Sequence, residues 1–355
     1  MKLKILLLVT FVFLSCKQRS KSIPLYVGTY TSGESEGIYK LQFNTTTGNF
    51  NNLELVANID DPSFITYSPN KEYIYAVGEG GEGSVSSFRV QKNGALKLLN
   101  KVKSNGGAPC HISINKTGDQ VVTSNYVGGN MALYTIKKDG SLDEASQVFD
   151  HNTLAQKSHA HSAQFFKNDL FVADLGRNAM YLYKKDINNT YKLKDSSLIE
   201  MTENAGPRHF SLTKDGQFIY IINEYASTIT TAQKSDNTFK LLNHTSTLSK
   251  DYKGESFCAD IHLSQDERFL YGSNRGENTI AVFKRNIETG TIEKIQNISV
   301  HGDWPRNFTL DPTGQFLLVA NKKSNNISVF GVDNSSGKLS FLHDINVPNP
   351  VCLLF

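Results

Sequence analysis

The feature of this chain that most constrains its fold is a sequence pattern that recurs along most of its length. Each copy has a short apolar segment, a polar turn and a second apolar segment, as in residues 109–115 with 120–125 and residues 305–311 with 315–321. Complete copies begin near residues 62, 108, 160, 206, 257 and 304, at intervals of about 45 to 52 residues. A repeat of this period predicts a fold that uses one supersecondary unit several times.

Two further strand-like segments follow in each copy. Residues 131–136 and 280–284 are examples of the third segment, and a glycine-containing turn such as Asp139-Gly140 leads into the fourth. Gly and Asn favour such turns because they tolerate the backbone conformations that tight turns need. Four short antiparallel strands per repeat are typical of a β-propeller blade, and the body of the chain has no sustained helical periodicity.

The two ends of the chain supply one more copy in two pieces. Residues 350–355 look like a first strand with nothing after it, whereas residues 25–30 and 38–43 look like second and third strands without a first. Joining the ends would complete a seventh blade and remove the exposed sheet edge of an open ring. We therefore predict an all-β, seven-bladed β-propeller over residues 24–355. Its blades are four-stranded and antiparallel, and its C-terminal strand joins the N-terminal blade.

Residues 1–15 have the composition of a bacterial-type signal peptide. Lys2 and Lys4 precede an apolar run over residues 5–14, which is too short to span a bilayer as a permanent helix. Residues 13–16, Phe-Leu-Ser-Cys, resemble a bacterial lipobox, which predicts lipid attachment at Cys16 and a short tether over residues 16–23. A plain signal peptide is the alternative interpretation. In either case we expect the protein in the cell envelope, lipid-anchored or periplasmic, with membrane contact only through a lipid anchor.

Several other classes of function are disfavoured by composition. The formal net charge is only +3 and the body has no Lys/Arg run, so nucleic-acid binding is not expected. Cys110, Cys258 and Cys352 lie in apolar segments, and their number and spacing indicate neither a disulfide framework nor a zinc site. Residues 78–83 match G-x-G-x-x-G, but a strand-like segment follows where a dinucleotide site needs a helix. We expect no metal and no cofactor.

Polar residues gather where the first strand of each repeat begins and the second strand ends. Because these strands are antiparallel and the first lines the channel, both positions meet at one mouth of the ring. The residues at these positions are His111, His159, His161, Arg208, His209, Asp260, Arg306, Asn307, Glu79, Asn125, Asp174, Arg177, Asn223, Glu224, Asn274, Arg275, Asn321 and Lys322. Arginines from several blades around one opening predict an anionic ligand, and His and Glu offer proton transfer. A water-filled channel whose charges pair with one another is the alternative.

Six short motifs resemble, in combination, the lactonase family of seven-bladed β-propellers. They are Pro109-Cys-His-Ile, His159-Ala-His-Ser, Gly206-Pro-Arg-His-Phe, Asn223-Glu-Tyr, Ser273-Asn-Arg-Gly and Trp304-Pro-Arg-Asn. The family includes the propeller type of 6-phosphogluconolactonase and the fungal carboxymuconate lactonizing enzyme. The resemblance covers the chain from about residue 24 to residue 355.

The resemblance implies a carboxylic ester hydrolase that opens a sugar lactone, converting 6-phosphogluconolactone to 6-phosphogluconate or acting on a related aldonolactone. The implied catalytic residues are His161 or His159, Arg208, Glu224 and Arg275. We further expect four residues to bind the small anionic substrate, namely His111, Asn125, His209 and Arg306. The alternatives are a cycloisomerase of a dicarboxylic-acid lactone and a non-catalytic ligand-binding propeller. The export signal puts the phosphorylated substrate in question, because the phosphogluconolactonases of the family are cytoplasmic. The sequence does not predict the oligomeric state.

Overall fold

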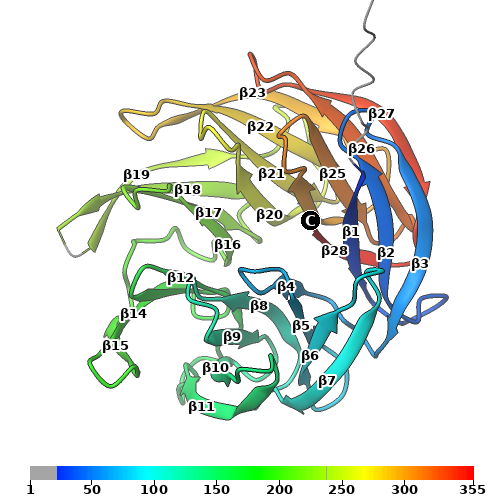
Figure 1. The fold of residues 1–355 in the computed structure, drawn as a ribbon. Coiled ribbons are helices and arrows are strands. Elements are labelled where there is room, and N and C mark those ends of the chain that lie inside the picture. Colours follow the sequence, from blue (N-terminus) through cyan, green and yellow to red (C-terminus); the bar gives the residue numbers. More distant parts are fainter. Residues whose placement is uncertain (1–21, 237) are drawn as a thin grey trace, which may run out of the picture.

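The computed structural model describes residues 22–236 and 238–355, which form seven four-stranded antiparallel sheets around a central axis (Figure 1). The signal segment and Cys16 lie outside the described residues. None of the described residues belongs to a helix long and apolar enough to cross a membrane.

The strands run in chain order and are grouped four to a blade. They are β1 (Ser22–Thr29), β2 (Gly37–Asn44), β3 (Phe50–Asn58), β4 (Ile65–Tyr67), β5 (Tyr73–Gly78), β6 (Ser84–Val90), β7 (Leu96–Lys103), β8 (Pro109–Ile114), β9 (Gln120–Asn125), β10 (Asn130–Ile136), β11 (Leu142–Asp150), β12 (Ala160–Phe166), β13 (Asp169–Asp174), β14 (Ala179–Lys185), β15 (Tyr191–Asp195), β16 (Pro207–Leu212), β17 (Phe218–Asn223), β18 (Thr228–Ser235), β19 (Thr238–Ser246), β20 (Phe257–Leu263), β21 (Phe269–Arg275), β22 (Thr279–Arg285), β23 (Ile292–Ser299), β24 (Pro305–Leu310), β25 (Phe316–Asn321), β26 (Asn326–Val332), β27 (Leu339–Asn346) and β28 (Pro350–Leu354). Each predicted blade is confirmed.

The ring is closed by the two ends of the chain, as the sequence predicts. β28 is the innermost strand of the sheet that continues with β1, β2 and β3. It pairs antiparallel to β1, with Tyr26 opposite Leu354 and Gly28 opposite Cys352. This pairing hydrogen-bonds the N-terminal blade to the last strand of the chain, so the described ring has no open edge on its inner side.

The core lies between neighbouring blades. Buried apolar side chains form seven clusters, and each joins the facing surfaces of two adjacent sheets. One such cluster brings Val122 and Met131 against Val172 of the next blade. Successive side chains of a strand point to opposite faces of its sheet. The middle strands carry apolar residues on both faces, because each sheet is covered on two sides. Every blade is thus stabilised by both of its neighbours.

Tyrosine side chains tie several blades to the next one in the ring. The hydroxyl of Tyr75 donates to the carbonyl of Gly140 at 3.1 Å, and that of Tyr220 donates to the carbonyl of Gly290 at 2.7 Å. Gly140 has a φ of 88°, and a Cβ there would lie 2.1 Å from the ring of Tyr73. Only glycine therefore fits this turn without displacing the tyrosine beneath it.

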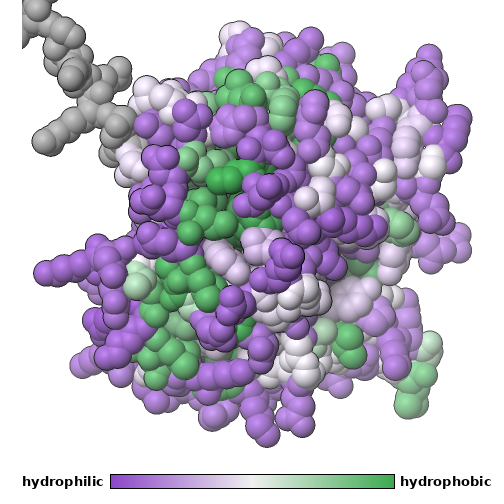
Figure 2. All heavy atoms as spheres, turned by 90° about the vertical axis from the view of Figure 1, so that its right-hand side faces the viewer, coloured by the Kyte–Doolittle hydropathy of each residue, from purple (hydrophilic) through white to green (hydrophobic). Residues whose placement is uncertain are grey.

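The outer strands face solvent on the rim of the ring. In Figure 2 hydrophilic residues cover most of the side where β3 lies, and hydrophobic residues form smaller patches between them. Exposed large apolar residues on these strands include Leu53, Leu55 and Leu342. The chemistry-bearing residues are instead concentrated around the inner strands.

Candidate active site

Five inner strands share a β-bulge near their first residue. The pairing register shifts between Pro109 and His111 in β8, and between equivalent residues in β12, β16, β20 and β24. A bulge leaves a residue without a partner in the ladder and re-aims its side chain. The residues inside these shifts are Cys110, His161, Arg208, Ala259 with Asp260, and Arg306. The same local irregularity in several blades thus places four of the predicted polar residues, His161, Arg208, Asp260 and Arg306, at one end of the channel.

Glu224 lies between two arginines that come from different blades. Its Oε2 atom is 3.0 Å from Nε of Arg208 and 2.8 Å from Nη2 of Arg275. The side chains of Arg208 and Arg275 are only 2% and 5% exposed. Both guanidinium groups also donate to backbone carbonyls, that of Arg208 to Ala259 and that of Arg275 to Cys258 at 2.8 Å. The pair is therefore held in place before any ligand arrives.

The charges in this cluster remain present at neutral pH. Burial alone would raise the pKa of Glu224, but Arg275 and Arg208 together lower it below its ordinary value. Burial, with the neighbouring Arg275 and Arg306, lowers the pKa of Arg208 to about 10, so this guanidinium still carries its proton at neutral pH. Two cations share one carboxylate, which leaves the cluster with a net positive charge that favours an anionic group.

Three histidines form a buried group beside the arginines. The ring of His209 lies 5.5 Å from that of His111 and 5.2 Å from that of His161, measured between centroids. Burial lowers the pKa of each ring, helped at His111 by His209 and at His161 by Arg208; burial and Arg208 lower the pKa of His209 to about 4. All three rings are therefore neutral at neutral pH, and each keeps one ring nitrogen without a hydrogen.

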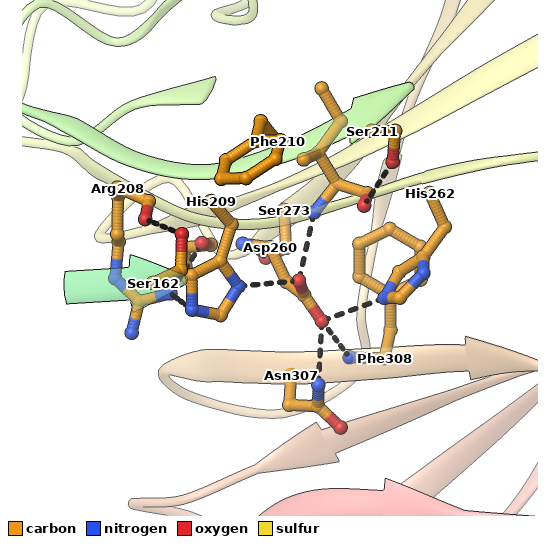
Figure 3. A network of polar contacts seen from close by, with 12 residues as sticks. Ser162, Arg208, His209, Phe210, Ser211, Asp260, His262, Ser273, Asn307 and Phe308 are labelled. Carbon is orange, nitrogen blue, oxygen red and sulfur yellow. Dashed lines mark hydrogen bonds and ion pairs between the residues drawn. The ribbon is translucent and has the colours of Figure 1, made fainter. Parts of the chain in front are cut away.

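Asp260 organises one of these histidines, as Figure 3 shows. Its Oδ1 atom accepts from Nδ1 of His209 at 2.8 Å, and its Oδ2 atom accepts from Nε2 of His262 at 2.9 Å. Asn307 donates to the same Oδ2 at 2.6 Å. Burial would raise the pKa of Asp260, but His262 and His209 hold it well below its ordinary value. Because Asp260 is an acceptor, Nδ1 of His209 carries the hydrogen and Nε2 keeps a lone pair.

The unprotonated nitrogen of His209 faces the arginine cluster. Its Nε2 atom accepts a long hydrogen bond of 3.4 Å from Nη1 of Arg208, and the two side chains are adjacent in Figure 3. An ionised carboxylate, a neutral imidazole and a guanidinium thus follow one another across the channel. The sequence placed Asp260 and Asn307 at the mouth without assigning them a role, and it did not identify His262. Asp260 and His262 lie two residues apart on β20, and this spacing was the sequence signal that could have identified His262.

The structure separates the two histidines of the His159-Ala-His161 segment. His161 lies in the buried group, and its Nδ1 atom is 3.8 Å from the sulfur of Cys110. The ring of His159 instead stacks on Tyr126 at 4.5 Å, and its Nδ1 atom donates to the carbonyl of Tyr126 at 2.8 Å. His161 is therefore the one placed beside the arginines. Tyr126, which the sequence did not single out, contacts both rings.

Asn125, predicted to bind substrate, makes two hydrogen bonds within the protein. Its amide nitrogen donates to the carbonyl of Ser104 at 2.9 Å and to Oδ1 of Asn130 at 2.6 Å. The side chain is fully buried, and its amide nitrogen bonds both to its own blade and to the segment that enters it from β7. Asn274 makes a similar bond to the carbonyl of Thr247 at 3.1 Å. Asparagine at the end of a second strand thus anchors the blade itself, which gives Asn125 a structural position.

Arg306 lies in a second ionic group at the same mouth. Its Nη2 atom is 3.9 Å from Oε1 of Glu79, and the hydroxyl of Tyr30 donates to Oε2 of Glu79 at 2.8 Å. Burial alone would lower the pKa of Arg306, but Tyr30 and Glu79 raise it above its ordinary value. The group is more open than the Glu224 cluster, since Arg306 and Glu79 are each 17% exposed.

Comparison with known proteins gives a consistent result. The family described as "Lactonase, 7-bladed beta-propeller" matches residues 24–355. Proteins named 6-phosphogluconolactonase from Bacillus subtilis and Formosa agariphila are 32% and 35% identical, over 93% and 90% of this chain and 97% and 95% of their own. A solved structure titled periplasmic gluconolactonase from Pseudomonas aeruginosa has a TM-score of 0.88 at 27% identity, covering 94% of this chain and 99% of that one.

Proposed function

We infer that this chain, which belongs to the lactonase family of 7-bladed β-propellers, is a carboxylic ester hydrolase that opens sugar lactones. We further propose that its substrate is 6-phosphogluconolactone or a closely related aldonolactone. The observation that carries the chemistry is the placement of two fixed guanidinium groups beside a neutral histidine whose tautomer a buried carboxylate sets. This combination offers oxyanion stabilisation and a proton acceptor in one place.

The proposed reaction begins with the lactone carbonyl facing Arg208 and Arg275. A water replaces the long contact of Arg208 at Nε2 of His209. His209 takes a proton from this water through Nε2, and the water oxygen attacks the carbonyl carbon. The charge that develops on the carbonyl oxygen is stabilised by the guanidinium groups. The bond from the carbonyl carbon to the ring oxygen then breaks, and the imidazolium returns the proton to that oxygen. The product is an open-chain hydroxy acid.

Asp260 and Glu224 act in this proposal through their neighbours. Asp260 stabilises the imidazolium that forms on His209, as the carboxylate does in a Ser-His-Asp triad. The negative oxyanion offsets the charge of Arg208, which makes His209 more basic during the reaction than in the resting protein. The Oε2 atom of Glu224 is already bound to both arginines, so we assign Glu224 the positioning of those arginines. His161 remains a second candidate for the proton acceptor.

A lactone hydrolysis assay tests the proposal. The purified domain is given 6-phosphogluconolactone and gluconolactone, spontaneous opening is subtracted, and the product is identified by mass. We expect catalysed opening with addition of one water. Changing Arg275→Lys should reduce kcat/KM by about 10- to 100-fold, because lysine keeps the charge but loses the planar donor pair. A wild-type protein that opens neither lactone, or that forms an isomer without adding water, would refute the proposal.

We also propose that the protein is exported and lipid-anchored through Cys16. The support is the segment Lys2 to Cys16, together with the periplasmic description of the Pseudomonas aeruginosa relative. Metabolic labelling with a radioactive fatty acid should mark the wild type and leave Cys16→Ala unlabelled. Equal labelling of both would exclude a lipid at this cysteine.

A further inference from the structure

Three cations at the channel mouth are not used by the proposed hydrolysis. Among the residues that the structure describes, Arg306 forms one long ion pair, 3.9 Å to Glu79. Lys322 and Lys323 follow the end of β25, and over residues 22–236 and 238–355 no carboxylate lies within ion-pair distance of either ammonium group. Within the described part of the chain, three converging cations thus have one nearby carboxylate, Glu79, between them. The surplus positive charge favours an anion that the protein itself does not supply.

Two aromatic rings hold these cations in place. Nζ of Lys323 lies 3.5 Å from the ring centroid of Trp304, and Nζ of Lys322 lies 4.6 Å from that of Tyr30. Arg306 also lies over Tyr30, at 5.2 Å. A cation over an aromatic face is positioned without being neutralised, unlike one paired with a carboxylate. The charge of each ammonium group therefore remains available to a ligand.

One of these rings, Trp304, connects Lys323 to the catalytic Arg275. The guanidinium of Arg275 lies 5.3 Å from the centroid of Trp304, the ring that also holds Lys323. Burial, followed by the nearby charge of Arg306, lowers the pKa of Lys322, and Lys323 and Arg275 add to this effect. The cations of β24 and β21 and of the turn after β25 thus lie around one opening. A ligand with its lactone carbonyl at Arg275 would present its far end to the lysines.

We propose that Arg306, Lys322 and Lys323 form a second anion subsite, which takes the phosphate of a phosphorylated aldonolactone. A phosphate carries a charge between −1.5 and −2 near neutral pH and has three strong acceptor oxygens, which suits three donors better than a single carboxylate would. The inference rests on the proposed lactonase function and deepens it, because it assigns the residues that select phosphorylated over unphosphorylated lactone.

The test removes the two lysines together. In Lys322→Ala/Lys323→Ala, the ratio of kcat/KM for 6-phosphogluconolactone to kcat/KM for gluconolactone should fall about tenfold or more, because charge-assisted contacts to phosphate are lost. The matched control is Lys116→Ala/Lys138→Ala, which removes the same charge from turns at the opposite end of the blades. This control should keep the wild-type ratio. An unchanged ratio in the first variant, or an equal fall in both, would overturn the inference.

A binding measurement separates failure of the subsite from failure of the lactonase proposal. Calorimetry with 6-phosphogluconate and with gluconate needs no turnover. The wild type should bind the phosphorylated acid more tightly, and the Lys322→Ala/Lys323→Ala variant should lose most of that preference. If the wild type opens neither lactone but still shows the lysine-dependent preference, only the hydrolase proposal fails. If the wild type shows no preference for 6-phosphogluconate, the phosphate subsite is wrong.

Discussion

The Glu224 carboxylate is the centre of the cationic cluster, and its removal gives the most informative perturbation. In Glu224→Gln the shape is retained but the charge between Arg208 and Arg275 is lost. Both guanidinium groups are almost fully buried, with side-chain exposures of 2% and 5%. Removing one partner of a buried ion pair costs about 3 to 5 kcal/mol, because the remaining charge has no compensation. Glutamine still offers an acceptor oxygen, so we expect the lower end, about 3 kcal/mol.

Thermal unfolding and lactone hydrolysis measure the two consequences. For a domain of this size about 3 kcal/mol corresponds to a loss of roughly 4 °C in Tm. Two unpaired arginines also repel each other and leave their positions, so kcat/KM should fall about 100-fold. Glu79→Gln is the matched control, since Oε1 of Glu79 lies 3.9 Å from Nη2 of Arg306 and both side chains are 17% exposed. This substitution should lower the free energy of unfolding by less than about 1 kcal/mol. A Glu224→Gln protein with unchanged Tm and full activity would refute this account of the cluster.

The stabilisation by Glu224 has a defined pH dependence. Its pKa in the folded protein lies below the ordinary value, owing to Arg275 and Arg208. A carboxyl group with a lowered pKa stabilises the fold fully above its unfolded pKa, and the stabilisation is lost as the pH falls through the folded pKa. The difference in Tm between the wild type and Glu224→Gln should therefore be constant at neutral pH and shrink in acid. A difference that grows in acid would contradict the ion-pair assignment.

His209, Asp260 and Tyr220 each give a further prediction. The acid limb of kcat/KM should lie well below pH 6, because the pKa of His209 is about 4; a limb near 6.5 would point to an exposed histidine. Asp260→Asn should lower kcat at least about 100-fold, because the tautomer of His209 is no longer fixed; a normal rate would exclude this role. Tyr220→Phe removes the bond to Gly290 and a 2.6 Å contact with Arg285, so unfolding free energy should fall by about 1 to 3 kcal/mol without loss of activity at 25 °C.

The fold was predictable because the repeat is carried by local sequence. Each copy contains its own apolar alternation and turn residues, and the incomplete ends, residues 25–43 and 350–355, complement each other. The closure between β1 and β28 then follows from the need to remove a sheet edge. No long-range information was required for either prediction.

The arrangement within the site was predictable only in part. The sequence placed Arg208, Glu224 and Arg275 at one mouth, and the structure brings these three together. It could not distinguish His159 from His161, because regular alternation would place both on one strand face, whereas the bulge in β12 moves His161 inward. The role of Asp260 depends on contacts with β16 and β24, and such contacts between blades leave no local pattern in the sequence.

Asn125 illustrates the opposite difficulty. Its place at the end of a second strand predicted a ligand-binding residue. In the structure its amide nitrogen donates to the carbonyl of Ser104 and to Oδ1 of Asn130. Buried backbone carbonyls near turns need donors, and asparagine supplies them. Asn125 and Asn274 occupy the same repeat position and bond to the backbone in the same way, which gives that position a structural cause. Glu224 instead pairs with two arginines of the site.

The most direct test of the central claim is the rate of lactone hydrolysis by His209→Asn, measured beside His244→Asn. His244 lies on the outer strand β19 and serves as the control. If His209 is the proton acceptor fixed by Asp260, kcat/KM of His209→Asn falls by about 100-fold or more, while His244→Asn stays within about twofold. If His209→Asn retains the wild-type rate and His161→Asn loses it, His209 is not the base and the proposed order of Asp260, His209 and Arg208 is wrong.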